Sequence, residues 1–239
     1  MKKDESITAA ELMSRLQNDP EFLERQARRD RDQATREARL KQAEAPILEE
    51  LKSLDVTPPG LDSLSRYYSP ISSGVVEILL RWLPLVSDET VQVLLVRALE
   101  CSKGTFDGKP LVELFESSRS ELLRWTIANT LAESRPLGVT DWLLSVVGDP
   151  SSGKAREMLA LAVARLAPKG PAKQALIGLL DEFPGHVAMA LAKIGDEHEL
   201  ELLRAKEKST KGWIKKEINK AIRSIEKRSQ PTNVSDYIS

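Results

Sequence analysis

A repeated pattern of paired apolar helices is the feature of this sequence that most restricts its fold. Between residues 71 and 228, predicted helices alternate with short breaks. Every second helix ends on an apolar anchor, and these anchors are Leu99, Leu131, Leu166, Ile194 and Ile222. The anchors are 32, 35, 28 and 28 residues apart, and periods of this size are typical of stacked helical hairpins. The sequence therefore predicts about five such hairpins.

The composition favours helices over strands. Only 5% of the 239 residues are aromatic, whereas strands prefer aromatic and β-branched side chains. Two of the second helices, MLALAVARLA at 158–167 and HVAMALAKI at 186–194, are apolar on nearly all sides. A helix of that kind must be covered on most sides, as the interior layer of a stack is. We therefore expect an all-α fold.

Composition divides the chain into four predicted segments. They are a charged helical N-terminal segment, a linker, the helical hairpins and a flexible C-terminal tail, over residues 1–54, 55–70, 71–228 and 229–239. The linker contains two adjacent prolines, a glycine and several serines, which oppose helix. The last hairpin carries more charge than the others, as expected of a terminal cap.

The N-terminal segment contains two predicted helix starts. Thr8 and Glu11 have the spacing of a capping box, and Asp19 followed by Pro20 marks a second helix start. The helix that follows has mixed charges at i, i+3 and i+4 and a thin apolar face, which cannot be deeply buried. We expect this helix either to cap the first hairpin or to mediate self-association.

Parts of the repeated region, PGHVAMALAKIGDEHELELLRA and VVEILLRWLPLVSDETVQVLLVRALE, are similar to HEAT-like repeats, including the short bacterial type of the phycobilin-lyase group. TAAELMSRLQNDPEF, LRWTIANTL and AREMLALAVARL also resemble an uncharacterised group of bacterial HEAT-repeat proteins. The resemblance implies a right-handed α-solenoid of about five HEAT-like hairpins. It also implies a scaffold that holds another protein, with the second helices lining a concave face.

Under that resemblance, polar and basic residues on the second helices are the candidate partner contacts. They are Arg97, Arg124, Asn129, Arg156 and Lys216. Arg124 and Asn129 lie in an otherwise apolar helix, where each needs either an internal partner or a ligand, and we favour the internal partner. The favoured function is a non-catalytic protein-binding scaffold or adaptor whose partner the sequence does not identify.

A second interpretation rests on the basic C-terminal segment. Between Arg204 and Arg228 there are ten basic and three acidic residues, a local net charge of +7 in a chain whose net charge is −1. Basic residues beside an aromatic side chain can bind the phosphates and bases of nucleic acid. The candidate residues are Lys211, Trp213, Lys215, Lys220 and Arg223. The alternative is a solvated capping helix with lysines near its C-terminus.

We find no motif that predicts catalysis, a cofactor or a metal site. His186 and His198 lie twelve residues apart with no cysteine beside them, so zinc is not expected and His186 is expected to be structural. The SSGKA sequence lacks the spacing of a phosphate-binding loop, and Ser151 or Ser152 is predicted to be an N-cap. The single cysteine, Cys101, is expected to be a buried structural thiol.

Two enzymatic alternatives come from resemblance alone. HEAT-like DNA glycosylases suggest a base-excision site at Trp125, Asp141 and Trp142, although both tryptophans also suit helix packing. The phycobilin-lyase resemblance suggests an enzyme acting on a protein-bound chromophore, without a nucleophile or an acid–base cluster to support it. No apolar run approaches the ~20 residues of a membrane span, so we expect a soluble, cytoplasmic protein.

Overall fold

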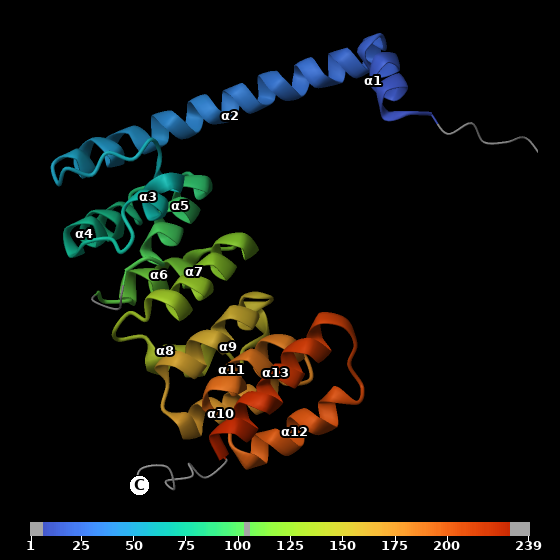
Figure 1. Ribbon diagram of the computed structural model, residues 1–239. Helices are drawn as coiled ribbons and strands as arrows, with labels where there is room; N and C mark the ends of the chain where they lie inside the picture. The colour runs from blue at the N-terminus through green and yellow to red at the C-terminus, as the bar shows by residue number, and fades with distance from the viewer. Residues whose placement is uncertain (1–6, 103–105, 230–239) are drawn as a thin grey trace, which may run out of the picture. The chain divides into compact units, whose positions relative to one another are not determined.

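The computed structural model describes residues 7–102 and 106–229, and within them the regular elements are α-helices and two short 3-10 helices. The all-α prediction is therefore confirmed (Figure 1). The chain divides into two units, residues 1–45 and 46–239. The predicted tail lies outside the described residues from residue 230 onward.

The first unit contains α1 (Ala9–Gln17) and the larger part of α2 (Pro20–Lys52). The predicted capping box is confirmed, because the backbone N–H of Thr8 donates to Glu11 Oε2 at 3.0 Å and the N–H of Glu11 donates to Thr8 Oγ1 at 3.3 Å. The second helix start is confirmed as well, since α2 begins at Pro20. All side chains from residue 23 to residue 39 are exposed, in agreement with a thin apolar face.

The last turns of α2 belong to the second unit. Ile47 and Leu51 are fully buried there. Glu50 accepts a hydrogen bond from Trp82 Nε1 at 2.7 Å and pairs with Arg81. The second unit therefore begins inside α2, at Pro46.

The predicted linker contains helix, so the expectation that residues 55–70 oppose helix is wrong. Residues 61–67 form η1 (Leu61–Ser63) and α3 (Leu64–Tyr67). Leu61 and Leu64 are at most 2% exposed, and both short helices contact α5 (Glu89–Leu99). The prolines precede this stretch, and burial of the two leucines against α5 outweighs the local preference against helix.

The remaining helices overlap the segments for which the sequence predicts helix. Their bounds are α4 (Ser73–Trp82), α6 (Lys109–Ser117), α7 (Glu121–Ser134), α8 (Thr140–Val146), α9 (Ala155–Leu166), α10 (Lys169–Leu179), α11 (Pro184–Ile194), α12 (Glu197–Glu207) and α13 (Gly212–Ser229). Contacts join α4 with α5, α6 with α7, α8 with α9, α10 with α11, and α12 with α13. Each contacting pair joins two helices that follow one another along the chain.

The odd-numbered helices from α5 to α13 form one layer of the second unit. Each of them contacts the next one along the chain (Figure 1). Every residue of α9 from Met158 to Ala164 is buried, which confirms that this helix is covered on most sides. The buried alanines Ala128, Ala132 and Ala160 leave room for α7 and α9 to approach closely. This packing is consistent with a helical repeat.

Polar side chains join neighbouring helices of this layer at their C-terminal ends. The last four backbone carbonyls of a helix have no hydrogen-bond donor within that helix. At three of the contacts between neighbouring helices of the layer, a side chain of the later helix donates to one of these carbonyls of the earlier helix. The bonds run from Thr130 Oγ1 to the Val96 carbonyl, from Arg165 Nη1 to the Ala132 carbonyl and from Ser224 Oγ to the Ala192 carbonyl, at 3.0, 2.5 and 2.9 Å. These bonds set the register between adjacent helices.

The predicted N-cap at Ser151 or Ser152 is wrong. Asp149 caps η2 (Pro150–Ser152) by accepting the backbone N–H of Ser151 at 2.9 Å, and α9 begins only at Ala155. The physical reason is the Asp149-Pro150 pair, since aspartate is a strong N-cap and proline suits the first helical position. The helical turn therefore starts earlier than the serines predict.

Candidate functional site

Arg156, a predicted partner contact, is part of the core. Its side chain is 7% exposed, and its Nε donates to the Val147 carbonyl at 3.0 Å. Its Nη1 lies 2.8 and 2.7 Å from the two carboxylate oxygens of Glu182. The partners of Arg156 are thus groups of this chain, and the side chain connects α9 with Val147 and Glu182.

Arg124 and Asn129 also bind inside the fold, as the preference for internal partners predicts. Arg124 Nη1 donates to the Ser151 carbonyl at 2.9 Å, and its guanidinium lies 4.3 Å from the ring centre of Phe115. Asn129 Nδ2 donates to Glu100 Oε1 at 2.9 Å. These two side chains connect neighbouring hairpins.

The other two predicted partner contacts, Arg97 and Lys216, are exposed. Arg97 lines a small cavity of about 190 Å³ together with Glu100 and Cys101. Cys101 is half-buried rather than buried, because this cavity leaves the thiol partly accessible. Burial raises the pKa of Glu100, although hydrogen bonds from Asn129 and Thr130 act in the opposite direction.

Five of the ten basic residues between 204 and 228 have a partner within the chain. The pairs are Arg204 with Glu226, Lys206 with Asp181, Lys215 with Glu207, Lys220 with Glu217, and Arg228 with the Gly195 carbonyl. Lys215, which was predicted to contact nucleic acid, pairs with Glu207 of α12 at 2.9 Å, and its side chain remains 45% exposed. Lys211 is exposed and directly precedes α13.

An exposed row of residues runs along α13. We refer to it as the α13 stripe, and it consists of Trp213, Lys216, Lys220, Arg223 and Lys227. The members are spaced by 3, 4, 3 and 4 residues, a spacing that places side chains on one side of a helix. The opposite side of α13, formed by Ile218, Ala221 and Ile225, is buried. The amphipathic pattern of α13 therefore turns the stripe to the solvent.

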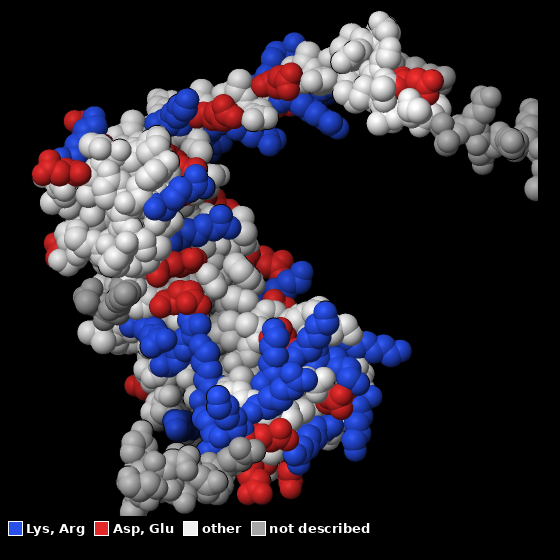
Figure 2. Space-filling view, in the orientation of Figure 1, with Lys and Arg blue, Asp and Glu red and all other residues white. Residues whose placement is uncertain are grey.

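The cations of the α13 stripe are largely free of internal partners. Within the described part of the chain, Lys216, Arg223 and Lys227 form no ion pair, and Lys220 lies 2.6 Å from Glu217. Figure 2 shows lysine and arginine side chains gathered on the part of the surface where Figure 1 places α13. The stripe extends over about 21 Å, since each helical residue advances the chain by about 1.5 Å.

Trp213 stands at the start of the stripe and packs against α11. Its six-membered ring lies against Gly185 of α11, where an added β-carbon would come within 2.3 Å of the ring. The His186 ring meets the indole edge-on, with ring centres 5.5 Å apart. The side chain nevertheless remains 53% exposed. His186 therefore has the structural role that the sequence predicts, as a support for the indole.

The C-terminal end of α11 carries a further cation. Lys193 of α11 is exposed. Burial of the ammonium group lowers the pKa of Lys193, and the nearby Arg165 and Arg135 lower it further, although Glu133 opposes them. Lys193 therefore lies near the charged side chains of Arg165, Glu133 and Arg135.

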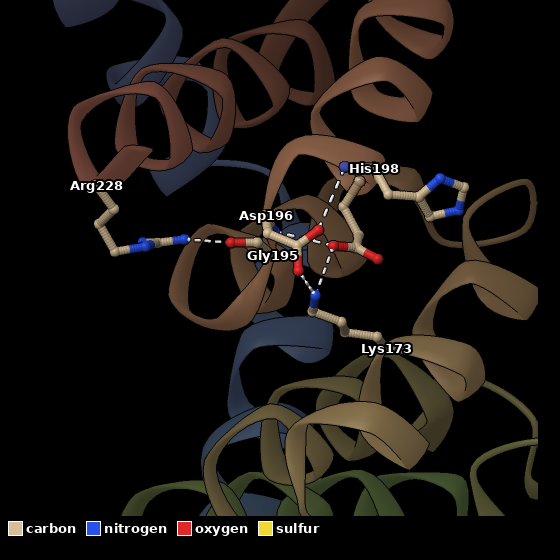
Figure 3. A network of polar contacts seen from close by, with 6 residues as sticks. Lys173, Gly195, Asp196, His198 and Arg228 are labelled. Atoms are coloured by element: carbon tan, nitrogen blue, oxygen red, sulfur yellow. Dashed lines mark hydrogen bonds and ion pairs between the residues drawn. The ribbon is translucent and has the colours of Figure 1, made fainter. Parts of the chain in front are cut away.

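A separate cluster of charged residues joins α10, α11, α12 and α13 (Figure 3). Lys173 Nζ lies 3.0 Å from Glu199 and also pairs with Asp196, and Arg228 Nη2 donates to the Gly195 carbonyl at 2.9 Å. Burial lowers the pKa of Lys173, but its hydrogen bonds to Asp196 and Glu199 outweigh burial and raise it. Since each of the four charged groups has a partner inside the fold, we regard the cluster as structural.

The residues suggested for catalysis lie on α7 and α8. Trp142 Nε1 donates to Glu116 at 2.9 Å, and its ring meets Phe115 edge-on at 5.1 Å, which is a packing role. Trp125 is half-buried on α7, and Asp141 is exposed on α8. Among the residues that the structure describes, no three His, Cys, Asp or Glu side chains are placed to hold a metal ion.

Comparison with known proteins gives no family for this chain. No family model, no curated protein and no solved structure matches it. Over the described ranges, no helix combines the length and the apolar character needed to cross a bilayer. The class that the fold defines is an all-α protein whose helix packing is consistent with a helical repeat.

Proposed function

We propose that this protein is a non-catalytic binding scaffold for an anionic macromolecule, built as a right-handed solenoid of about five HEAT-like hairpins. In this proposal the four cations of the α13 stripe are the contact surface, and the layer from α5 to α13 is the support behind them. The side-chain bonds to last-turn carbonyls in that layer support its rigidity. Stacked repeats suit such a role because they leave an extended surface free.

The observation that carries the proposal is the row of cations without internal partners. Among the described residues, Lys216, Arg223 and Lys227 lack an ion pair, whereas five other cations of the same segment, including Lys220 of the stripe, have a partner within the chain. Neighbouring like charges repel each other, and an anionic partner relieves that repulsion. The row is therefore better explained as a contact surface than as a support of the fold.

The sequence favours another protein as the partner and nucleic acid as the alternative. Three of the five candidate protein contacts, Arg124, Asn129 and Arg156, are bound inside the fold, which shifts the proposal toward the α13 stripe. The acidic surface of a protein and a nucleic acid would both satisfy these cations. The anionic character of the partner is what defines the proposed function.

Inorganic polyphosphate is a suitable first probe, because it carries charge without bases or peptide groups. Titration of the full chain with labelled polyphosphate should show saturable binding. The K216Q/R223Q/K227Q variant should bind about tenfold more weakly or worse, because it removes three of the four cations of the stripe.

A matched variant separates the stripe from the total charge. K52Q/K109Q/K169Q removes the same charge from three exposed lysines on α2, α6 and α10. It should bind polyphosphate as the wild type does. Equal losses in the two variants, or no binding by the wild type, would contradict the proposal.

A further inference from the structure

We propose that the α13 stripe binds single-stranded nucleic acid, with one base stacked on Trp213 and the phosphates following the four cations. This inference rests on the proposed function and adds the chemical class of the partner. It depends on the one member of the stripe that charge alone does not explain, the tryptophan.

Trp213 has the properties of a stacking platform. Its indole is 53% exposed although its six-membered ring packs against Gly185 and the His186 ring lies T-shaped to it, with ring centres 5.5 Å apart. A side chain that is already ordered loses little conformational entropy when a ligand stacks on it. Exposed aromatic rings beside a cationic groove are how proteins bind single strands with little sequence preference.

The cations continue from the platform at a regular interval. Lys216, Lys220, Arg223 and Lys227 follow Trp213 at steps of three or four residues, which is about 5 Å along the helix axis per step. A single strand carries one charge per nucleotide, so an evenly spaced row of cations can follow its backbone. A base at Trp213 and phosphates along α13 would thus belong to one continuous strand.

A duplex fits this arrangement less well. Its bases are stacked within the helix, so a tryptophan at the end of a cationic row could not stack on one without opening the duplex. A membrane surface fits less well too, because the apolar side of α13, with Ile218, Ala221 and Ile225, is buried in the fold and cannot enter a bilayer.

The test compares a probe with bases and a probe without them. The full chain is titrated with a labelled oligothymidylate of about 12 nucleotides, a length within the site sizes of single-strand binding domains. The same titration is made with polyphosphate, with polyglutamate and with a duplex of equal length. W213A should weaken oligothymidylate binding by about 5- to 150-fold and leave polyphosphate binding unchanged. W213F, which keeps an aromatic ring, should lose less than W213A.

Polyphosphate binding by W213A is also the control for folding of the stripe. If W213A binds oligothymidylate as well as the wild type, or loses both probes equally, the inference is wrong. Tighter binding of polyglutamate or of the duplex than of oligothymidylate would also overturn it. In each of these cases the proposed function survives as long as polyphosphate binds through the stripe. Failure of polyphosphate to bind the wild type would remove the proposed function itself.

Discussion

Gly185 of α11 lies directly against the indole of Trp213 of α13, so close that a β-carbon at position 185 would come within 2.3 Å of the ring. This contact joins the beginnings of the two helices. At their other ends, the Ser224 hydroxyl donates to the Ala192 carbonyl at 2.9 Å. The helix that carries the α13 stripe is therefore held to the layer at both ends.

Gly185→Ala should displace Trp213 and destabilise the protein by about 1–3 kcal/mol, because the added methyl group overlaps a packed ring. Urea unfolding measures the free energy, and tryptophan emission reports the displaced indole. Gly178→Ala is the matched control, since nothing lies within 4 Å of its added β-carbon. Gly178 is the second-to-last residue of α10, so that change should stabilise the protein by no more than about 0.5–1 kcal/mol. Equal effects of the two substitutions would mean that the contact with Trp213 is not close.

Thr130→Val should cost about 1–3 kcal/mol of the free energy of unfolding. The side chain is buried, and its hydroxyl donates to the Val96 carbonyl at 3.0 Å. Valine keeps the shape but leaves that carbonyl without the donor. Thr90→Val, at an exposed position of α5, should change the free energy by less than about 0.5 kcal/mol. A difference too small to resolve between the two variants in urea would show that the bond does not support the layer.

Glu100 gives a prediction about pH. Burial raises its pKa in the folded protein above the ordinary value of about 4.3. Protonation therefore favours the folded state, and the contribution of Glu100 to stability is lost as the pH rises through the raised pKa. Glu100→Gln removes the charge and keeps an acceptor for Asn129, so it should be more stable than the wild type at neutral pH. That advantage should shrink as the pH falls toward 4.

Urea midpoints of the two proteins between about pH 4 and pH 7.5 test the Glu100 prediction. The remaining titratable groups are the same in both proteins and largely cancel in the difference. If the stability advantage of Glu100→Gln over the wild type grew as the pH fell, the pKa of Glu100 would not be raised in the folded protein, and the prediction would be wrong.

Two N-terminal deletions distinguish the two units. Deletion of residues 1–45 leaves Pro46 at the new start of α2, a favourable first helical residue, and removes a buried side chain, Glu44, so it should lower the thermal midpoint only slightly. Deletion of residues 1–54 also removes the fully buried Ile47 and Leu51, each contributing about 1.5–3 kcal/mol, and should lower the midpoint clearly. Equal midpoints for the two deletions would contradict the assignment of the α2 terminus to the second unit.

The shorter deletion also tests self-association. The first unit exposes the apolar side chains of Leu12, Met13 and Leu23, which a second copy could cover. If this unit mediates self-association, light scattering should find a dimer for the full chain and a monomer after removal of residues 1–45. An identical number of copies before and after the deletion would exclude that role.

Much of the fold could be predicted because helices follow from local patterns. The spacing of apolar residues within each helix and the helix starts at Thr8 and Asp19 depend on residues within a few positions of one another. The structure contains the helices that these patterns predict. The helix in the predicted linker was missed, because Leu61 and Leu64 are stabilised by α5, some thirty residues further along the chain. Burial against a distant element is not visible in a local pattern.

The candidate site could be predicted only in part, for the same reason. The local charge identified Trp213, Lys220 and Arg223, but Lys215 turns toward Glu207 on a neighbouring helix. Lys227 was missed although the 3-4 spacing along α13 could have identified it. The contact of Gly185 with Trp213 joins residues from two hairpins, and only the packing of α11 against α13 shows it.

The central claim is that the cations of the α13 stripe form the binding surface, and the salt dependence of binding tests it most directly. The association constant for labelled oligothymidylate is measured at several salt concentrations for the wild type and for K216Q/R223Q/K227Q. Four phosphate contacts on a single strand predict a slope of about −3 for log K against log salt, and the variant, with one cation left, should give a slope of about −1. Equal slopes for the two proteins would place the binding surface elsewhere and contradict the account.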